Sequence, residues 1–324
     1  MKTISLLDTS INNYNLGNQI IMSSIELIIN DLFDNNFIYK MQASEPFGRT
    51  SIQNFNKSDF IFFGGTNALT SNINKEKYIG FSLHNLFYFN HLLLLGVGWW
   101  QYQKKPNLYT KIFLKRMLHS SMLHSVRDSY TKKMLESIGI ENVVNTSCPS
   151  TWGLDKNHCN QISQSKSDSV VFTITDYSKQ PETDTMFINQ LLNRYQEIFF
   201  WPQGVGDLEY FSLLEIPLRD KIKVLQPNLK SFDSLMENNK LDYIGTRLHA
   251  GIRALQYKNR ALIIAIDNRA LEIAHDINLD ISERGNLDQI SFFVENNSSS
   301  LIKIPTLEID RWKNQFNSDI KEKK

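Results

Sequence analysis

Short apolar runs alternate with stretches of helical periodicity along the first half of the chain. The apolar runs predict strands, at residues 2–10, 37–42, 60–67, 92–100, 121–126 and 142–147. Helices are predicted at 18–34 and at 128–138, the latter capped by Asp128 and stopped by Gly139. Runs that are apolar throughout suit parallel strands covered on both faces. The pattern therefore predicts an α/β domain.

A second series of the same kind follows a polar interval. Residues 155–168 gather Ser, Gln, Asn and Lys, as an exposed connection between domains does. Beyond them the apolar runs restart, at residues 169–177, 198–204, 222–227, 241–246 and 261–267. We therefore predict a Rossmann-like domain at 1–154, a second at 169–305 and a closing helix at 306–324. Two doubly wound domains joined in this way are expected to face each other across a cleft.

Composition narrows the class of protein. The 324 residues are 41% hydrophobic and 21% charged, which is typical of a soluble globular chain. Lys and Arg number 35 against 34 Asp and Glu, so no overall field attracts nucleic acid, and no nucleic-acid partner is expected. No signal peptide or spanning segment is evident, so we expect a cytoplasmic protein. The Cys and His spacings predict no metal site.

The stretch LDYIGTRLHAGIRALQ, at 241–256, reads as a strand, a turn and a helix that begins near Thr246. Amide groups at a helix start bind anions, which makes Gly245 and Thr246 candidate anion contacts. Arg247 can grip a phosphate or carboxylate through two N–H groups. In a regular helix it would be offset by about 200° from His249, so it reaches a ligand only at an irregular helix start.

Two further residues of this helix have alternative roles. His249 can gain or lose a proton near neutral pH, or it can be an ordinary histidine at the sheet edge. Arg253 shares a face with His249, and it can belong to the same site or pair with an acid on another helix.

Open parallel sheets bind ligands beyond the carboxyl ends of their strands, so polar or aromatic residues there are further candidates. They are Asn15, Asn18, Asp8, Asp176, Trp99 and Gln203. The two carboxylates can act in proton transfer or as caps, and Trp99 can stack on a sugar or belong to the core. The basic, partly amphipathic segment 104–121 can contact anionic lipid or be a solvated helix face.

The stretch DYIGTRLHAGIRAL resembles the C-terminal signature of the polysaccharide pyruvyl transferase family, whose Arg-Leu-His triplet stands at 247–249. Further likenesses follow the chain in order, with NLGNQ at 15–19, FFGG at 62–65, GVGW at 96–99 and SVRDSYTKKMLESIGI at 125–140. The resemblance covers most of the chain and implies a GT-B-like fold. Relatives often have Lys at the position of Arg269, and many have an acid at that of Asn18.

The resemblance also implies a reaction. It is transfer of a pyruvyl group from phosphoenolpyruvate to two hydroxyls of one sugar, in a polysaccharide or lipid-linked glycan precursor. The products are a cyclic pyruvate ketal and phosphate, and no metal or other cofactor is implied. Two alternatives stay open: a GT-B glycosyltransferase that uses a sugar nucleotide, and a non-catalytic glycan-binding protein of a capsule or cell-wall assembly.

The resemblance places Arg247 and His249 in the active site, and Arg127 and Arg269 around the trianionic donor. The donor's charges would favour protonated His249, which we expect to act as the acid. Asp176 or Asp8 is the candidate for the second proton transfer. The first domain is expected to hold the acceptor.

Overall fold

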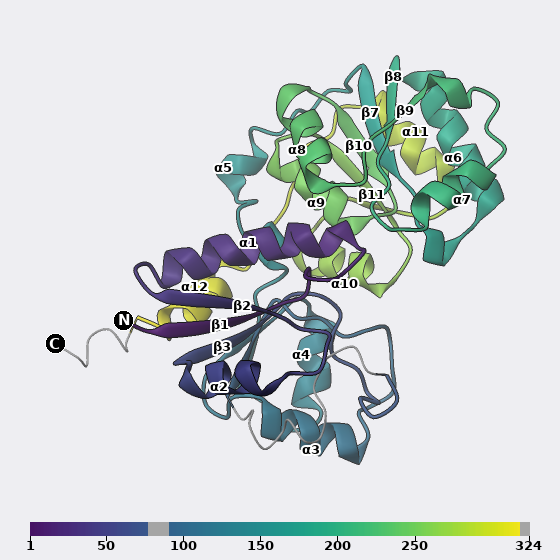
Figure 1. Ribbon diagram of the computed structural model, residues 1–324. Coiled ribbons are helices and arrows are strands. Elements are labelled where there is room, and N and C mark those ends of the chain that lie inside the picture. Colours follow the sequence, from purple (N-terminus) through teal and green to yellow (C-terminus); the bar gives the residue numbers. More distant parts are fainter. Residues whose placement is uncertain (77–90, 318–324) are drawn as a thin grey trace. The chain divides into compact units, whose positions relative to one another are not determined.

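The computed structural model describes residues 1–76 and 91–317, and the chain divides into two units (Figure 1). Unit 1 contains residues 1–13, 21–152 and the C-terminal segment from 304. Unit 2 contains residues 14–20 and 153–303. The predicted boundaries therefore miss two features: residues 14–20 group with unit 2, and so does the interval 155–168, which we expected to be a linker. The last seven residues of the expected helix at 306–324 lie outside the described residues.

Unit 1 is a parallel α/β structure. Its strands are β1 (Thr3–Asp8), β2 (Phe37–Gln42), β3 (Phe60–Gly64), β4 (Leu92–Leu95), β5 (His124–Val126) and β6 (Val143–Asn145). Its helices are α1 (Leu16–Leu32), whose first turn groups with unit 2, α2 (Arg49–Lys57), α3 (Leu108–Met117), α4 (Ser129–Glu136), the short 3-10 helix η2 (Pro149–Thr151) and α12 (Thr306–Asn314).

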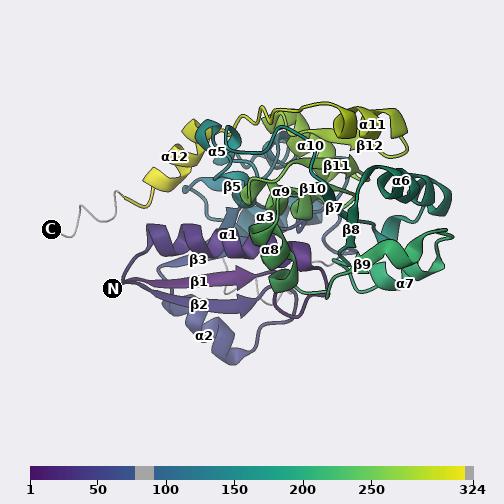
Figure 2. The same ribbon diagram turned by 90° about the horizontal axis from the view of Figure 1, so that it is seen from above.

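The sheet of unit 1 has the order β2-β1-β3-β4, and β5 and β6 form a parallel pair. The Gly96 amide donates to the Ser125 carbonyl at 3.0 Å, which links the end of β4 to β5. Both views show α1 and α2 on opposite faces of the sheet (Figures 1 and 2). The core is completed from the C-terminal segment, because the rings of Trp312 and Phe316 pack on Phe62.

Unit 2 is a second parallel α/β structure. Its strands are β7 (Ser169–Thr173), β8 (Glu197–Phe200), β9 (Ile222–Val224), β10 (Asp242–Gly245), β11 (Ala261–Ala265) and β12 (Ile281–Glu283). Its helices are α5 (Lys156–Cys159), η3 (Asp176–Ser178), α6 (Pro181–Arg194), α7 (Asp207–Leu213), η4 (Arg219–Lys221), α8 (Leu229–Asn238), α9 (Leu248–Gln256), α10 (Asn268–Ile277) and α11 (Leu287–Glu295).

The sheet of unit 2 has the order β12-β11-β10-β7-β8-β9, with every pair parallel. This is the doubly wound Rossmann order, in which the direction of winding reverses between the first and fourth strands. Here these strands are β7 and β10. A ligand site is therefore expected where both strands end, beyond Thr173 and Gly245.

Each predicted strand run overlaps an observed strand, but several strands are shorter than predicted. The run at 92–100 gives β4, which ends at Leu95 because Gly96 takes a φ of +66°. The helix predicted at 128–138 is confirmed as α4: the Asp128 carboxylate accepts from the Thr131 amide at 2.7 Å, and Gly139 has a φ of +79°. Among the described residues, none of the helices combines the length and apolarity that crossing a membrane requires.

Candidate functional site

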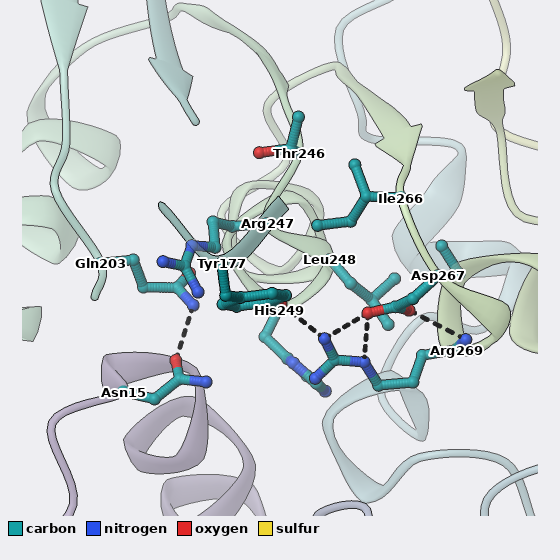
Figure 3. Close-up of a pocket in the computed structure, with 11 residues that line it drawn as sticks. Asn15, Tyr177, Gln203, Thr246, Arg247, Leu248, His249, Ile266, Asp267 and Arg269 are labelled. Carbon is teal, nitrogen blue, oxygen red and sulfur yellow. Dashed lines mark hydrogen bonds and ion pairs between the residues drawn. The ribbon is translucent and has the colours of Figure 1, made fainter. Parts of the chain in front are cut away.

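A pocket opens in unit 2 at the switch point between β7 and β10. Its polar lining comes from five segments that are distant in sequence, as Figure 3 shows, and includes Asn15, Tyr177, Gln203, Arg247, His249 and Arg269. The pocket therefore gathers the carboxyl ends of β7, β8, β10 and β11 and the N-terminal end of α1.

Arg247 stands at the N-cap of α9 with extended backbone angles, φ −97° and ψ 100°. The irregular helix start that the sequence argument required is therefore present. Arg247 is only 4% exposed, and its Nη2 donates to both Asp207 and Asp176, the latter at 3.2 Å. The guanidinium carbon lies 5.1 Å from the centre of the Tyr177 ring. Two carboxylates thus neutralise a side chain that we expected to be a free anion clamp.

Asp207 is the main residue that the sequence argument missed. It begins α7, is fully buried, and accepts from the amides of Asp176, Gln203 and Gly204 at 3.0, 3.0 and 2.7 Å. Burial raises the pKa of its carboxyl, and the Arg247 charge partly offsets that rise. The Gly-Val-Gly-Asp run after β8 was the only sequence signal for it.

Gly204 explains why this run is rich in glycine. A Cβ at that position would collide with Nη2 of Arg247. Because the arginine is buried and paired, it could not yield without breaking its contacts with Asp207 and Asp176. Gly204 therefore permits the ion pair.

The start of α9 offers fewer free donors than we expected. The amides of Thr246 and Arg247 donate to the backbone oxygen and the hydroxyl of Thr173, at 3.1 and 3.2 Å. Thr246 is thus not available as a backbone donor to an anion, which corrects that expectation. Gly245 instead serves close packing, since a Cβ there would meet the Thr173 backbone.

His249 lies in the first turn of α9, and its side chain lines the pocket although the residue is only 6% exposed (Figure 3). Arg269 approaches from α10. Its guanidinium donates to the carboxylate of Asp267, the N-cap of α10, and to the Tyr177 hydroxyl at 2.7 Å. Tyr177, also missed from sequence, therefore stacks on one arginine and accepts from the other.

The first turn of α1 supplies the opposite wall. Nε2 of Gln203 donates to Oδ1 of Asn15 at 3.0 Å, and the same oxygen accepts from the Gly17 amide at 2.9 Å. Oε1 of Gln203 and Nε of Arg247 are both buried without a hydrogen-bond partner among the described residues. These two atoms therefore have unused hydrogen-bonding capacity in residues that line the pocket. Asn18 is buried one turn along, and its amide donates to the Asn15 carbonyl.

Three of the predicted site residues, Arg127, Asp8 and Trp99, belong to unit 1 and have partners there. Arg127 is 1% exposed and pairs with Asp128 at 3.2 Å. Asp8 accepts from the amide and hydroxyl of Ser10, at 2.7 and 2.6 Å, so its carboxylate closes a local turn. Trp99 is fully buried and donates to Gln103 at 2.9 Å, which makes it a core residue rather than a sugar platform.

The two readings of Arg253 are resolved in favour of a structural role. Its guanidinium makes two hydrogen bonds of 2.8 Å to Asp233 on α8. It does not line the pocket. Within the described parts of the chain, no group of three or more His, Cys, Asp or Glu side chains could hold a metal ion.

The model of the polysaccharide pyruvyl transferase family matches residues 15–268. The chain belongs to this family. The match begins at Asn15 and ends one residue before Arg269, so it spans every other pocket-lining side chain named above. Membership supports a transferase that modifies polysaccharide. The family match includes Arg247 and His249, and their roles in the site are predictions.

Solved structures show the fold of this pyruvyl transferase family member. Staphylococcus aureus MnaA, in its UDP co-structure, is 11% identical, with 99% of this chain and 96% of that chain covered and a TM-score of 0.56. The UDP-GlcNAc 2-epimerase of Neisseria meningitidis, bound to UDP-GlcNAc, is 11% identical over 99% and 100%, with a TM-score of 0.52. The fold is therefore GT-B-like. No curated protein sequence matches the chain.

Proposed function

We propose that the protein transfers the pyruvyl group of phosphoenolpyruvate to a sugar of a polysaccharide or lipid-linked glycan precursor. One sugar hydroxyl adds to C2 of the donor while a proton is delivered to C3, which becomes the methyl group. A second hydroxyl of the same sugar then bonds to C2, loses its proton, and displaces phosphate. The products are a cyclic pyruvate ketal and inorganic phosphate, and no other cofactor is needed.

The observation that carries the proposal is the convergence of Arg247, His249 and Arg269 on one pocket at the switch point of unit 2. The donor presents a phosphate and a carboxylate, which need cations and fixed hydrogen-bond donors. In the proposal, Arg269 and the unpartnered Nε of Arg247 meet these groups, and Oε1 of Gln203 accepts from a sugar hydroxyl.

The carboxylates of the site set a condition on donor binding. Asp176, Asp207 and Asp267 balance the two guanidiniums, so an added trianion is repelled unless it displaces one of these acids. Of the two acids that pair with Arg247, Asp176 is the more accessible, with 28% of its side chain exposed against 0% for Asp207. We propose that donor phosphate takes the place of Asp176 on Arg247.

That displacement would also free Asp176 for chemistry. His249 is proposed to deliver the proton to C3, and Asp176 to accept the proton from the attacking hydroxyl. Asp8 remains the alternative base, but its carboxylate already holds Ser10. Asn15 and Asn18, in the first turn of α1, are proposed to contact the acceptor.

The test is phosphate release from phosphoenolpyruvate in the presence of glycan acceptors, with mass spectrometry of the glycan. His249→Gln and Arg247→Ala are each expected to lower turnover by about 100-fold or more. Arg253→Ala is the matched control, because it removes a cation from the same helix outside the pocket. Its turnover should stay near that of the unchanged protein.

Thermal-shift titration separates the alternative reaction. Stabilisation by phosphoenolpyruvate and not by sugar nucleotides is the expected result. Stabilisation by a sugar nucleotide alone would replace the proposal with glycosyl transfer, and glycan binding without any new product would leave only a binding protein. Equal turnover in the His249→Gln variant and the Arg253→Ala control would refute the assigned site.

A further inference from the structure

Helix α3 of unit 1 divides cleanly into a buried and an exposed face. Its buried residues are Thr110, Phe113, Leu114 and Met117, which join the core of the unit. Its exposed residues are Leu108, Lys111, Ile112, Lys115 and Arg116. At about 100° per residue, the exposed set falls within an arc of about 140°. Figure 1 shows α3 at one edge of unit 1.

The exposed face combines an apolar ridge with positive charge. Leu108 and Ile112, four residues apart and therefore adjacent on the helix surface, are 70% and 58% exposed. On the helical projection, Lys111 and Lys115 lie to one side of this ridge and Arg116 to the other. A water-facing helix gains nothing from two adjacent large aliphatic side chains in the middle of its exposed arc, so the ridge points to a partner with an apolar interior.

The sequence that contains the helix carries charge of one sign. No Asp or Glu occurs between Glu76 and Asp128 in the sequence, whereas Lys104 and Lys105 directly precede the helix. Both lysines are exposed. The chain as a whole carries only +1, so this segment concentrates positive charge that the rest of the protein balances. An anionic partner fits such a surface.

We propose that the exposed face of α3 binds the surface of an anionic phospholipid bilayer. Leu108 and Ile112 would enter the boundary between headgroups and acyl chains, while Lys111 and Lys115 extend to the phosphates. The apolar ridge distinguishes this partner from an anionic polymer, which would use the cations alone. The inference goes beyond the proposed reaction and does not depend on it.

The test is co-sedimentation of the full chain with phosphatidylcholine vesicles that contain or lack phosphatidylglycerol. Binding is expected only with phosphatidylglycerol, and added salt should weaken it. The Leu108→Ser/Ile112→Ser variant should bind at least about tenfold more weakly. Lys111→Glu/Lys115→Glu should weaken binding by more than about 25-fold, because losing each lysine costs roughly fivefold and the anionic surface also repels the two glutamates.

Matched controls come from unit 2. Leu213→Ser removes an equally exposed leucine, 67% exposed, and Lys221→Glu/Lys230→Glu reverses two exposed lysines elsewhere. Both should bind vesicles as the unchanged protein does. Thermal unfolding of each variant, with and without phosphoenolpyruvate, shows whether the fold and the donor site persist, so a failure of the proposed reaction does not affect this test.

Three outcomes would overturn the proposal. The unchanged protein could fail to bind phosphatidylglycerol vesicles, or the Leu108→Ser/Ile112→Ser variant could bind them equally well. The third outcome is association of the protein with itself, lost in that variant, which would assign the ridge to a second copy of the chain.

Discussion

The segments 124–128 and 245–249 invite comparison, because each combines a strand end, an arginine and a histidine. In unit 1, His124 lies within β5 and is fully buried, and Arg127 pairs with the next residue, Asp128. In unit 2, Arg247 is held by acids 40 and 71 residues away, and His249 lines a pocket. The same residue types are therefore local structure in one unit and a candidate site in the other.

Position relative to the switch point accounts for the difference. The Arg247 segment follows β10, which lies beside β7 in the sheet. From these two strands the chain adds further strands in opposite directions, so the connections after β7 and β10 diverge and leave a pocket. The Arg127 segment follows β5, which pairs with the consecutive strand β6. Its helix α4 is capped by Asp128, the same acid that pairs with Arg127. In unit 1, Asp128 therefore both caps α4 and pairs with Arg127.

The largest expected effect is on stability, from removing the acid beside each arginine. Asp207→Ala should lower the free energy of unfolding by about 3–5 kcal/mol, because three amides lose their acceptor and the buried Arg247 keeps only the partly exposed Asp176 as an ion-pair partner. Asp128→Ala should cost less, since its carboxylate holds one amide and a longer ion pair. Urea denaturation of both variants measures the difference.

A double variant sharpens this comparison. Arg247→Met/Asp207→Ala should be more stable than Asp207→Ala alone, because the buried charge that lost its buried partner has also been removed. If the two substitutions were additive, or if Asp128→Ala cost as much as Asp207→Ala, the stronger role assigned to the non-local ion pair would be wrong.

The next effect concerns His124, the structural counterpart of His249. Its Nδ1 accepts from the Leu94 amide at 3.3 Å and its Nε2 faces the His119 carbonyl at 2.9 Å, which suits only the neutral ring. Burial lowers the pKa of its ring to about 4, from the usual histidine value of 6.5. The unfolded chain therefore binds a proton as pH falls below about 6.5 while the folded chain does not.

Stability contributed by neutral His124 is thus complete above pH 6.5 and lost as pH falls towards 4, by roughly 3 kcal/mol in total. Urea denaturation across this range should give a shallower pH slope for His124→Gln than for the unchanged protein. His275→Gln, at a side chain 84% exposed, is the control and should keep the original slope. Equal slopes in all three proteins would show that His124 titrates normally.

Sequence sufficed for features that depend on near neighbours. The apolar runs located eleven strands, Asp128 and Gly139 marked the ends of α4, and Arg247 was expected at an irregular helix start. The three-residue strand β12 has no apolar run and was missed. The partners of Arg247 and Arg269 were also missed, because Asp207 and Tyr177 are 40 and 92 residues distant and only the sheet order brings them together.

The smallest expected effect concerns Tyr177, which contacts both arginines of the pocket in unit 2. Its ring stacks on Arg247 and its hydroxyl accepts from Arg269, so it fixes the spacing of the two guanidiniums proposed to hold the donor. Tyr177→Phe keeps the ring and loses one hydrogen bond, which should raise the KM for phosphoenolpyruvate about fivefold. Tyr177→Ala also loses the stacking and should raise it further.

Stability should change little in either variant, because Tyr177 is 57% exposed. Tyr257 provides the matched control: it stacks under Arg253 at 5.0 Å and accepts from it at 3.4 Å, but it does not line the pocket. Tyr257→Phe should therefore leave the KM unchanged. A positioning role for Tyr177 requires that kcat change less than KM. If Tyr177→Phe lowered kcat alone, or matched Tyr257→Phe, the two arginines would not depend on Tyr177 for their spacing.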